Sequence, residues 1–159
     1  MALKKNDSIP DDNHILRYVS PSRLRKDEDD KVIGILGEAF KRREGEDNLS
    51  ANWLEYFPGS HDEQVTDTIK EIRKHIVVKP RAGFAIGKVG DIKAVCADKR
   101  GRKIHVVSYP TQKKTLDGKS YKNESHVAVK SLPADDMELL ELLATEAWCH
   151  LVLNNTVPS

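Results

Sequence analysis

The chain is poor in cysteine, has no long apolar run and carries almost no net charge. Its two cysteines, Cys96 and Cys149, form neither a CxxC pair nor a zinc-finger spacing. We therefore expect reduced thiols in a reducing compartment and no metal site, with a Cys96–Cys149 disulfide left open. No stretch approaches the roughly 18 apolar residues that a membrane-spanning helix needs, so no membrane association is predicted.

Neither sign of charge dominates, because 26 lysines and arginines face 25 aspartates and glutamates. A dedicated, sequence-independent nucleic-acid binder needs a strong positive field. The balance argues against that class but allows a local basic patch. The N-terminal stretch MALKKNDSIPDDN has no apolar core of the kind found in a signal peptide. We therefore expect a cytoplasmic protein.

The chain also lacks the signatures of common cofactor-binding folds. No glycine-rich loop opens a predicted helix and strands do not alternate regularly with helices, so a dinucleotide-binding or P-loop fold is disfavoured and no cofactor is predicted. The 159 residues suit one domain, large enough to fold without a disulfide. We expect a single domain over 13–154, between mobile tails over 1–12 and 155–159.

The hydrophobic pattern predicts four strands, over 14–19, 83–89, 103–109 and 126–132. The last two are expected to form a hairpin around a long, mobile, basic loop over 111–124. Together the strands predict an α+β domain, with a small, mainly antiparallel sheet of about four strands and helices on one face.

Three helices are predicted. The clearest starts at the capping box of Ser60 and Glu63 and closes at Lys79-Pro80, and a broad apolar face predicts another over 137–154. A short helix over 51–57 would be capped by Ser50. The segment 27–43 is ambiguous: its two glycines favour a pair of short strands, but its charge order and its apolar face favour a helix, which we expect here. Residues 91–101 fit a helical turn or a strand equally well.

Histidines on predicted strands form the first candidate site. His14, His105 and His126 lie in or beside strand patterns, and Arg17 follows His14 on the same strand. Two neutral imidazoles and an arginine suit phosphoester chemistry, with one histidine as base, the other as acid and the arginine on the phosphate. The stretches HVVS and HVAV do not match the His-apolar-Ser/Thr motif of two-histidine phosphoesterases. The alternative is that these histidines are structural and hydrogen-bonded to their neighbours.

A second candidate site combines Arg17, Ser50 and Glu55. A strand arginine, then serine, then glutamate resembles the order in which some ADP-ribosyl-transferring folds bind a dinucleotide. Here Ser50 and Glu55 fall on one predicted short helix. The alternative is an N-cap serine and a surface glutamate beside a buried tryptophan.

A basic segment and an aromatic segment are candidate binding surfaces. Aromatic residues interleave with cations around the loop over 111–122, as in single-strand nucleic-acid binders, although a solvated loop explains the charges equally well. The candidates are Arg100, Arg102, Lys113, Lys114, Lys119 and Tyr121. The run NWLEYFPG places more aromatic residues together than one short helix can bury, so some are expected at an interface: Trp53, Tyr56 and Phe57.

The segment LSANWLEYF, the late SHVAV strand and the short acid-started helix resemble small bacterial cytosolic proteins with no assigned function. The resemblance implies no activity, cofactor or catalytic residue. Our leading hypothesis is therefore a binding or accessory subunit without turnover. It would act on a protein or nucleic-acid partner, or on a second copy of itself, through the basic loop and the Trp53–Phe57 segment. The alternatives are a histidine-dependent enzyme on a nucleotide or phosphoester, and a dinucleotide-handling transferase.

Overall fold

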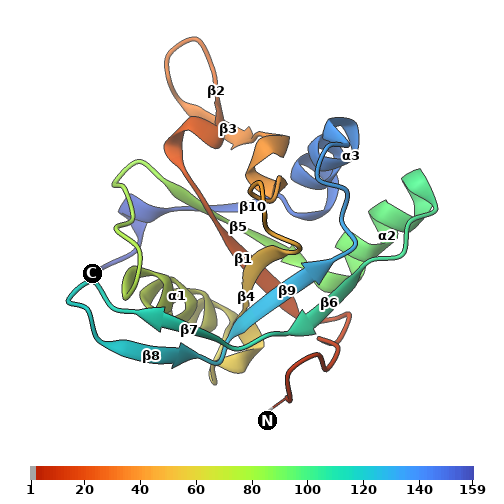
Figure 1. The fold of residues 1–159 in the computed structure, drawn as a ribbon. Coiled ribbons are helices and arrows are strands. Elements are labelled where there is room, and N and C mark those ends of the chain that lie inside the picture. The colour runs from red at the N-terminus through yellow and green to blue at the C-terminus, as the bar shows by residue number, and fades with distance from the viewer. Residues whose placement is uncertain (1–2) are drawn as a thin grey trace.

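A six-stranded antiparallel sheet is the centre of the structure, a computed structural model that describes residues 3–159 (Figure 1). The strand order is β10-β5-β1-β4-β9-β6. The strands are β1 (His14–Val19), β4 (Leu49–Trp53), β5 (Gly83–Lys88), β6 (His105–Ser108), β9 (His126–Lys130) and β10 (His150–Leu153). The predicted α+β class and antiparallel pairing are confirmed, with six strands in the main sheet where about four were expected.

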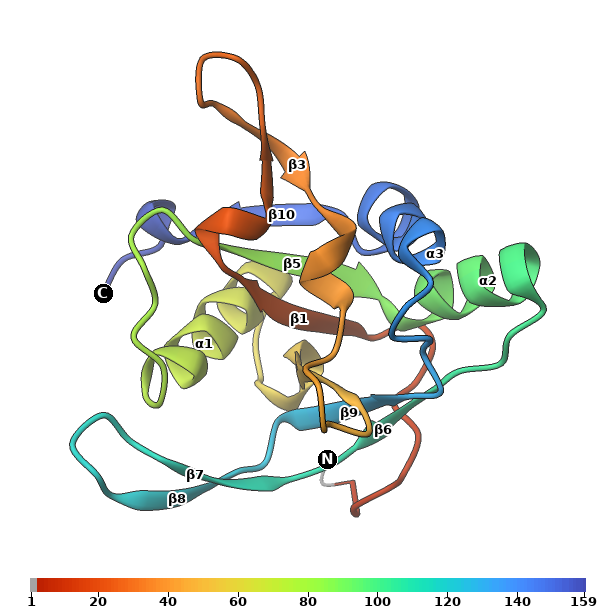
Figure 2. The same ribbon diagram turned by 45° about the horizontal axis from the view of Figure 1, so that its top comes forward.

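Helices cover both faces of this sheet (Figure 2). They are α1 (His61–Arg73), α2 (Val89–Arg100) and α3 (Met137–Leu142). α1 packs Ile69 and Ile72 against Leu16 and Phe84, on one face. α2 and α3 lie over the other face. The expectation of helices on one face is therefore wrong, because alternate residues of β1 and β5 are apolar on both sides of the sheet.

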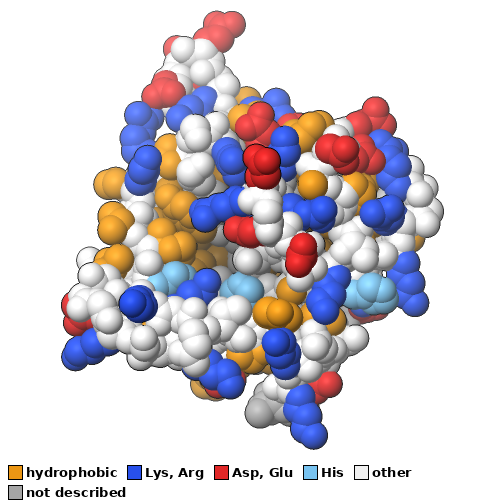
Figure 3. Space-filling view, in the orientation of Figure 1, with side chains coloured by type: hydrophobic (Ala, Val, Ile, Leu, Met, Phe, Trp, Pro, Cys, Tyr) orange, Lys and Arg blue, Asp and Glu red, His pale blue; other side chains and the backbone are white. Residues whose placement is uncertain are grey.

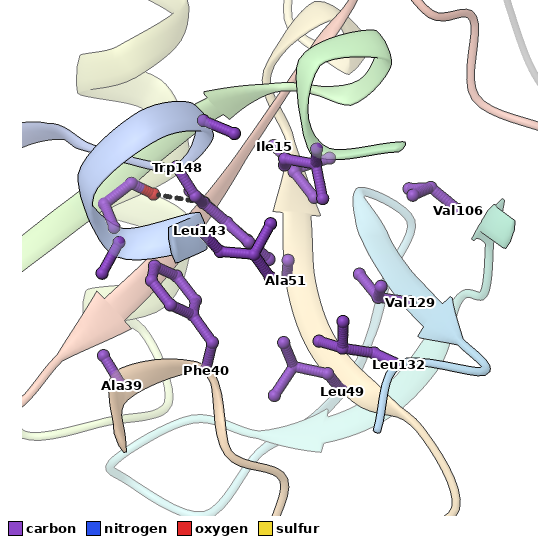
Figure 4. Packing of buried hydrophobic residues seen from close by; sticks show 14 of the residues in the cluster. Ile15, Ala39, Phe40, Leu49, Ala51, Val106, Val129, Leu132, Leu143 and Trp148 are labelled. Carbon is purple, nitrogen blue, oxygen red and sulfur yellow. Dashed lines mark hydrogen bonds between the residues drawn. The ribbon is translucent and has the colours of Figure 1, made fainter. Parts of the chain in front are cut away.

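The larger hydrophobic cluster lies between the sheet and α2 and α3 (Figure 4). Within it Phe40 stacks on Trp148, with ring centroids 4.5 Å apart. Trp148 also donates from Nε1 to the Ala85 carbonyl of β5 at 3.1 Å. The indole therefore anchors the C-terminal segment to β5 while satisfying its own polar group. No helix within residues 3–159 is long and apolar enough to cross a bilayer.

The ambiguous segment 27–43 forms a hairpin and a turn, so the favoured helix was wrong. β2 (Leu24–Lys26) pairs with β3 (Val32–Ile35), and a 3-10 turn follows over Gly37–Phe40. The carboxylate of Asp27 accepts from the backbone N–H groups of Asp29 and Lys31, which closes the hairpin turn. The acidic run that resembled a helix start is thus a capped turn, at the end of a projecting hairpin (Figure 2).

Two other predicted helices contain strands. Residues 49–53 form β4 with Ser50 inside it, and only Leu54–Tyr56 turn helically. The C-terminal helix ends in a π-helical turn at Ala147, and residues 150–153 then form β10 on the edge of β5. In both places, apolar residues at helical spacing are buried by strand pairing instead. The remaining ambiguous segment, 91–101, lies largely within α2.

The predicted mobile loop over 111–124 is ordered as a second hairpin. β7 (Thr111–Lys114) pairs with β8 (Ser120–Asn123), and Gly118 supplies the positive φ of the turn. We call residues 111–123 the basic arm. Within the predicted N-terminal tail over 1–12, Ile9 is buried and its N–H donates to the Val106 carbonyl at the β6 edge.

The sheet divides between β1 and β4. These strands pair only at Ile15–Trp53 and Leu16–Asn52, whereas β1 pairs with β5 along its whole length. Beyond Leu16 the two strands separate. The gap lies inside the sheet, so side chains from both faces can reach it.

Candidate functional site

A polar pocket of about 580 Å³ lies at the gap between β1 and β4. It contains Arg17 and Ser50 from the two separating strands, His75 from the end of α1, and His126 from β9. Lys113 and Asn123 of the basic arm also line it. A pocket with convergent polar side chains is the usual form of a small-ligand site.

Arg17 bridges the gap. Its Nη1 donates to the Ser50 carbonyl of β4 and its Nε to the Ala39 carbonyl of the 3-10 turn, both at 2.6 Å, so one side-chain bond spans the gap between the two strands. These bonds leave Nη2 for a ligand. Burial, reinforced by the positive charges of Arg23 and Arg43, lowers the pKa of Arg17 to about 10, with Glu46 acting in the opposite direction. The guanidinium therefore stays charged at neutral pH, held by neutral carbonyls.

His126 presents a defined ring nitrogen. Its Nδ1 lies 2.7 Å from the Tyr109 carbonyl, which can only accept, so Nδ1 carries the proton and Nε2 holds the lone pair. Burial lowers the pKa of His126 to about 4, with Lys113 and His75 adding to the effect and the Tyr109 bond opposing it. The ring is therefore neutral at physiological pH and presents Nε2 as an acceptor.

His75 is held in the same tautomer by a side-chain relay. The Tyr121 hydroxyl donates to Glu71 Oε2 at 2.6 Å, so its oxygen accepts from His75 Nδ1 at 2.7 Å. Burial, and then the charge of Lys113, lowers the pKa of His75. Burial, and then the bond to Glu71, raises the pKa of Tyr121, which keeps its proton in place. The relay joins α1 to the basic arm, and His75 Nε2 has no hydrogen-bond partner within residues 3–159.

Cations outnumber anions around the pocket. Its arginines and lysine are Arg17, Arg23, Arg43 and Lys113, against one acid, Glu46. Figure 3 shows histidine side chains beside lysine and arginine side chains on the face between the basic arm and the sheet. A cationic pocket in a chain of net charge +1 is a local feature, and it favours an anionic ligand.

A buried amide network holds the floor of the pocket. Asn123 donates from Nδ2 to Asn52 Oδ1 at 3.0 Å, and Ser125 donates from Oγ to Asn123 Oδ1 at 2.8 Å. Asn52 pairs with His126 across β4 and β9. The network therefore fixes the basic arm to the strand pair that carries His126, which sets the ring position.

Only some of the predicted site residues meet. Arg17, Ser50, His126 and Lys113 line the pocket. His14 lies elsewhere, with its Nδ1 2.6 Å from Glu55 Oε2 and its ring 5.1 Å from that of His61. His105 is exposed on β6 opposite Lys130. Glu55 does not line the pocket, so Arg17, Ser50 and Glu55 do not share it.

The predicted binding segments are divided among different environments. Trp53 is buried and donates from Nε1 to Asn13 Oδ1, while Tyr56 is exposed against Phe57.

The predicted basic residues are also divided. Arg100 pairs with Asp136 and Glu138 at the end of α2, and Arg102 donates to the Ser131 carbonyl. Lys114 and Lys119 are exposed on the basic arm, and Tyr121 belongs to the relay.

His75, Asn52 and Asn123 were missed by the sequence analysis. His75 lies two residues beyond α1, but it stands four residues after Glu71, whose side chain is buried beside the apolar stripe of that helix. A glutamate on a buried helix face requires a partner. That requirement was the available signal for a polar cluster at this end of α1.

A second hollow of about 760 Å³ lies beside the pocket. Arg42, Arg102 and Lys130 line it, together with the acids Asp47 and Asp135. Arg42 donates from Nη1 to the Leu132 carbonyl at 2.9 Å. This hollow is larger, but it contains no imidazole, so the chemistry of the first pocket makes that one the candidate active site.

Comparisons with protein-family models, with curated proteins and with solved structures find no match to this chain. Within residues 3–159 no three histidine, cysteine or acidic side chains gather as a metal site would require. Cys96 is buried and Cys149 exposed, and both are free thiols. The geometry of the pocket is therefore the basis for a functional proposal.

Proposed function

We propose that the protein is a phosphoester hydrolase that uses His126 and His75 as its base and acid. The observation that carries the proposal is the pair of imidazoles in one cationic pocket, each bonded through Nδ1 and open at Nε2. This arrangement supports the histidine-dependent alternative over a subunit that acts by contact alone. His75 takes the place in it that the sequence suggested for His14 or His105.

The charges of the pocket suit a phosphoryl group. Arg17 Nη2 and the Lys113 ammonium would bind the non-bridging oxygens, where negative charge gathers in the transition state. Burial and the charge of Lys113 lower the pKa values of both histidines. A bound anion would offset the charge of Lys113 and would therefore raise both pKa values. Substrate binding thus brings the imidazoles closer to the pH at which acid–base catalysis works.

The reaction balances with one water molecule. His126 Nε2 accepts a proton from the water as its oxygen attacks phosphorus. The bond from phosphorus to the leaving oxygen breaks, and a protonated His75 gives its Nε2 proton to that oxygen. The roles follow from burial, because His126 is the harder of the two to protonate. Both rings then exchange protons with solvent.

The test combines phosphate binding with turnover. We expect inorganic phosphate to raise the pKa values of both pocket histidines in NMR titrations, and the enzyme to hydrolyse an aryl phosphomonoester or an aryl phosphodiester. His126→Asn and His75→Asn keep a donor at the Nδ1 position and remove Nε2, so each should lower kcat by at least about 100-fold. His105→Asn is the matched control and should change neither quantity.

Several outcomes would contradict the proposal. Phosphate binding without turnover of either ester would leave a binding module, and an equal loss of activity in His105→Asn would remove the pocket from the chemistry. Arg17→Met should weaken phosphate binding at least tenfold. If that variant fails to fold, Lys113→Met tests the same cationic requirement from the exposed arm.

A further inference from the structure

The cationic surface continues beyond the pocket in two directions. On one side lies the basic arm, whose residues include four lysines and one aspartate. On the other lies the second hollow with Arg42, Arg102 and Lys130. The consecutive residues Arg42 and Arg43 line different hollows, so the 41–48 segment separates the two and both open beside it.

The arm directs its lysines to two sides. Lys113 and Tyr121 face each other across the β7–β8 ladder and point to the pocket, where Lys113 lines the wall and Tyr121 holds His75. The neighbouring Lys114 and Lys122 alternate to the exposed side, and Lys119 is exposed before β8. Lys122 lies 3.7 Å from Glu124, and within residues 3–159 neither Lys114 nor Lys119 forms an ion pair.

The second hollow also contains guanidinium groups that could bind a phosphate. Arg102 uses Nε on the Ser131 carbonyl and Arg42 uses Nη1 on the Leu132 carbonyl. Among the described residues neither guanidinium pairs with a carboxylate, although Asp47 and Asp135 line the same hollow. A single small phosphoester would occupy the pocket alone and leave both flanking cationic surfaces without a ligand.

We infer that the substrate is a single-stranded nucleic acid, whose scissile phosphodiester sits in the pocket while neighbouring phosphates contact the basic arm and the second hollow. The inference rests on the proposed function. A repeating anion on a narrow, flexible chain fits three adjacent cationic surfaces, and basic grooves that follow the backbone are typical of single-strand binders. A duplex is stiff over this length, whereas a single strand can bend to follow all three surfaces.

The test is the dependence of binding on strand length. Anisotropy titrations would use labelled RNA and DNA of two, four and eight nucleotides, the matching duplex, and a mononucleotide as competitor. The eight-nucleotide strand should bind at least tenfold more tightly than the mononucleotide, and affinity should fall steeply with salt. Binding of RNA alone would identify the 2′-hydroxyl as a contact, and equal binding of DNA would identify the backbone alone.

Charge reversal separates the surfaces. The double variant Lys114→Glu/Lys119→Glu should lower the ratio of oligonucleotide affinity to phosphate affinity at least tenfold and reduce the salt slope by about 2. Arg102→Glu should lower the same ratio from the other side. Lys99→Glu makes the same charge change as Arg102→Glu, on the exposed end of α2, and should leave the ratio unchanged.

The inference and the proposed function fail differently. Equal affinity for mononucleotide and oligonucleotide, or for strand and duplex, would overturn the inference while aryl ester hydrolysis by His75 and His126 still stood. Length-dependent binding with no hydrolysis of any ester or strand would retain the single-strand surface and overturn the catalytic role. A loss of affinity in Lys99→Glu as large as in Arg102→Glu would reduce the effect to net charge and overturn the inference.

Discussion

Arg17 replaces backbone pairing with side-chain pairing at the point where β1 leaves β4. Its bond to the Ser50 carbonyl links β1 to β4, and its bond to the Ala39 carbonyl holds the 3-10 turn beside a space large enough for a ligand. A buried guanidinium without a carboxylate partner costs stability, and such groups are retained where they serve a ligand. At the residue scale, this unneutralised charge is the main evidence that the pocket binds an anion.

His126 makes the stability of the protein depend on pH. Its pKa in the folded protein, about 4, lies below its ordinary value of 6.5. The unfolded chain therefore binds the extra proton between these two values, and stability falls as the pH is lowered from 6.5 to 4. The full effect is about 3 kcal/mol, because one pKa unit corresponds to roughly 1.4 kcal/mol.

Denaturant unfolding at a series of pH values measures this effect. His126→Asn keeps the bond to the Tyr109 carbonyl and removes the titration, so its stability should change less between pH 6.5 and 4. His105→Asn, on the exposed end of β6, should follow the unmodified protein. Parallel curves for His126→Asn and the unmodified protein would assign the acid sensitivity to other groups.

At the element scale, the glycines of the 32–40 segment distinguish the observed hairpin and turn from the helix that the charge pattern favours. A Cβ on Gly37 would lie 2.7 Å from the Glu141 backbone nitrogen, whereas a Cβ on Gly34 would lie 3.9 Å from its nearest neighbour. Gly37→Ala should therefore destabilise the protein by about 2–4 kcal/mol, because the new methyl group would clash with backbone atoms of α3, which cannot move aside as a flexible side chain can.

Gly34→Ala is the matched control and should change stability by less than about 1 kcal/mol. A helix over this segment would give the opposite result, because each Gly→Ala substitution would then stabilise the protein by about 1 kcal/mol. Chemical denaturation of the two variants decides between them, and equal effects at the two positions would contradict the packing of this turn against α3.

Elements were predictable from sequence where local signals were sufficient. The Ser60–Glu63 capping box located α1, and short apolar runs bounded by turn residues located β1, β5, β6 and β9. β4 and β10 were taken as helices because pairing with a distant strand decides their conformation. For the site, Arg17 and His126 were found as polar residues in strand patterns. Their convergence with His75 depends on the separation of β1 from β4, which no local pattern encodes.

At the scale of the whole molecule, β1 and β5 belong to both hydrophobic layers. Ile15 and Ala85 face α2 and α3, whereas Leu16 and Phe84 face α1. A sheet that supplies both cores predicts that the layers unfold together as one cooperative unit. The pocket between the layers would then depend on both for its geometry.

Ile69→Ala tests this cooperativity from the side remote from the tryptophans. Ile69 is fully buried under α1, whereas Trp53 and Trp148 both belong to the opposite cluster. The substitution should cost about 2–5 kcal/mol and lower the unfolding midpoint equally by far-UV circular dichroism and by tryptophan fluorescence. Val77→Ala, on a side chain 74% exposed, should leave the midpoint nearly unchanged. If the dichroism midpoint falls while the fluorescence midpoint stays, the two layers fold independently, because the loss on one face has not reached the tryptophans on the other.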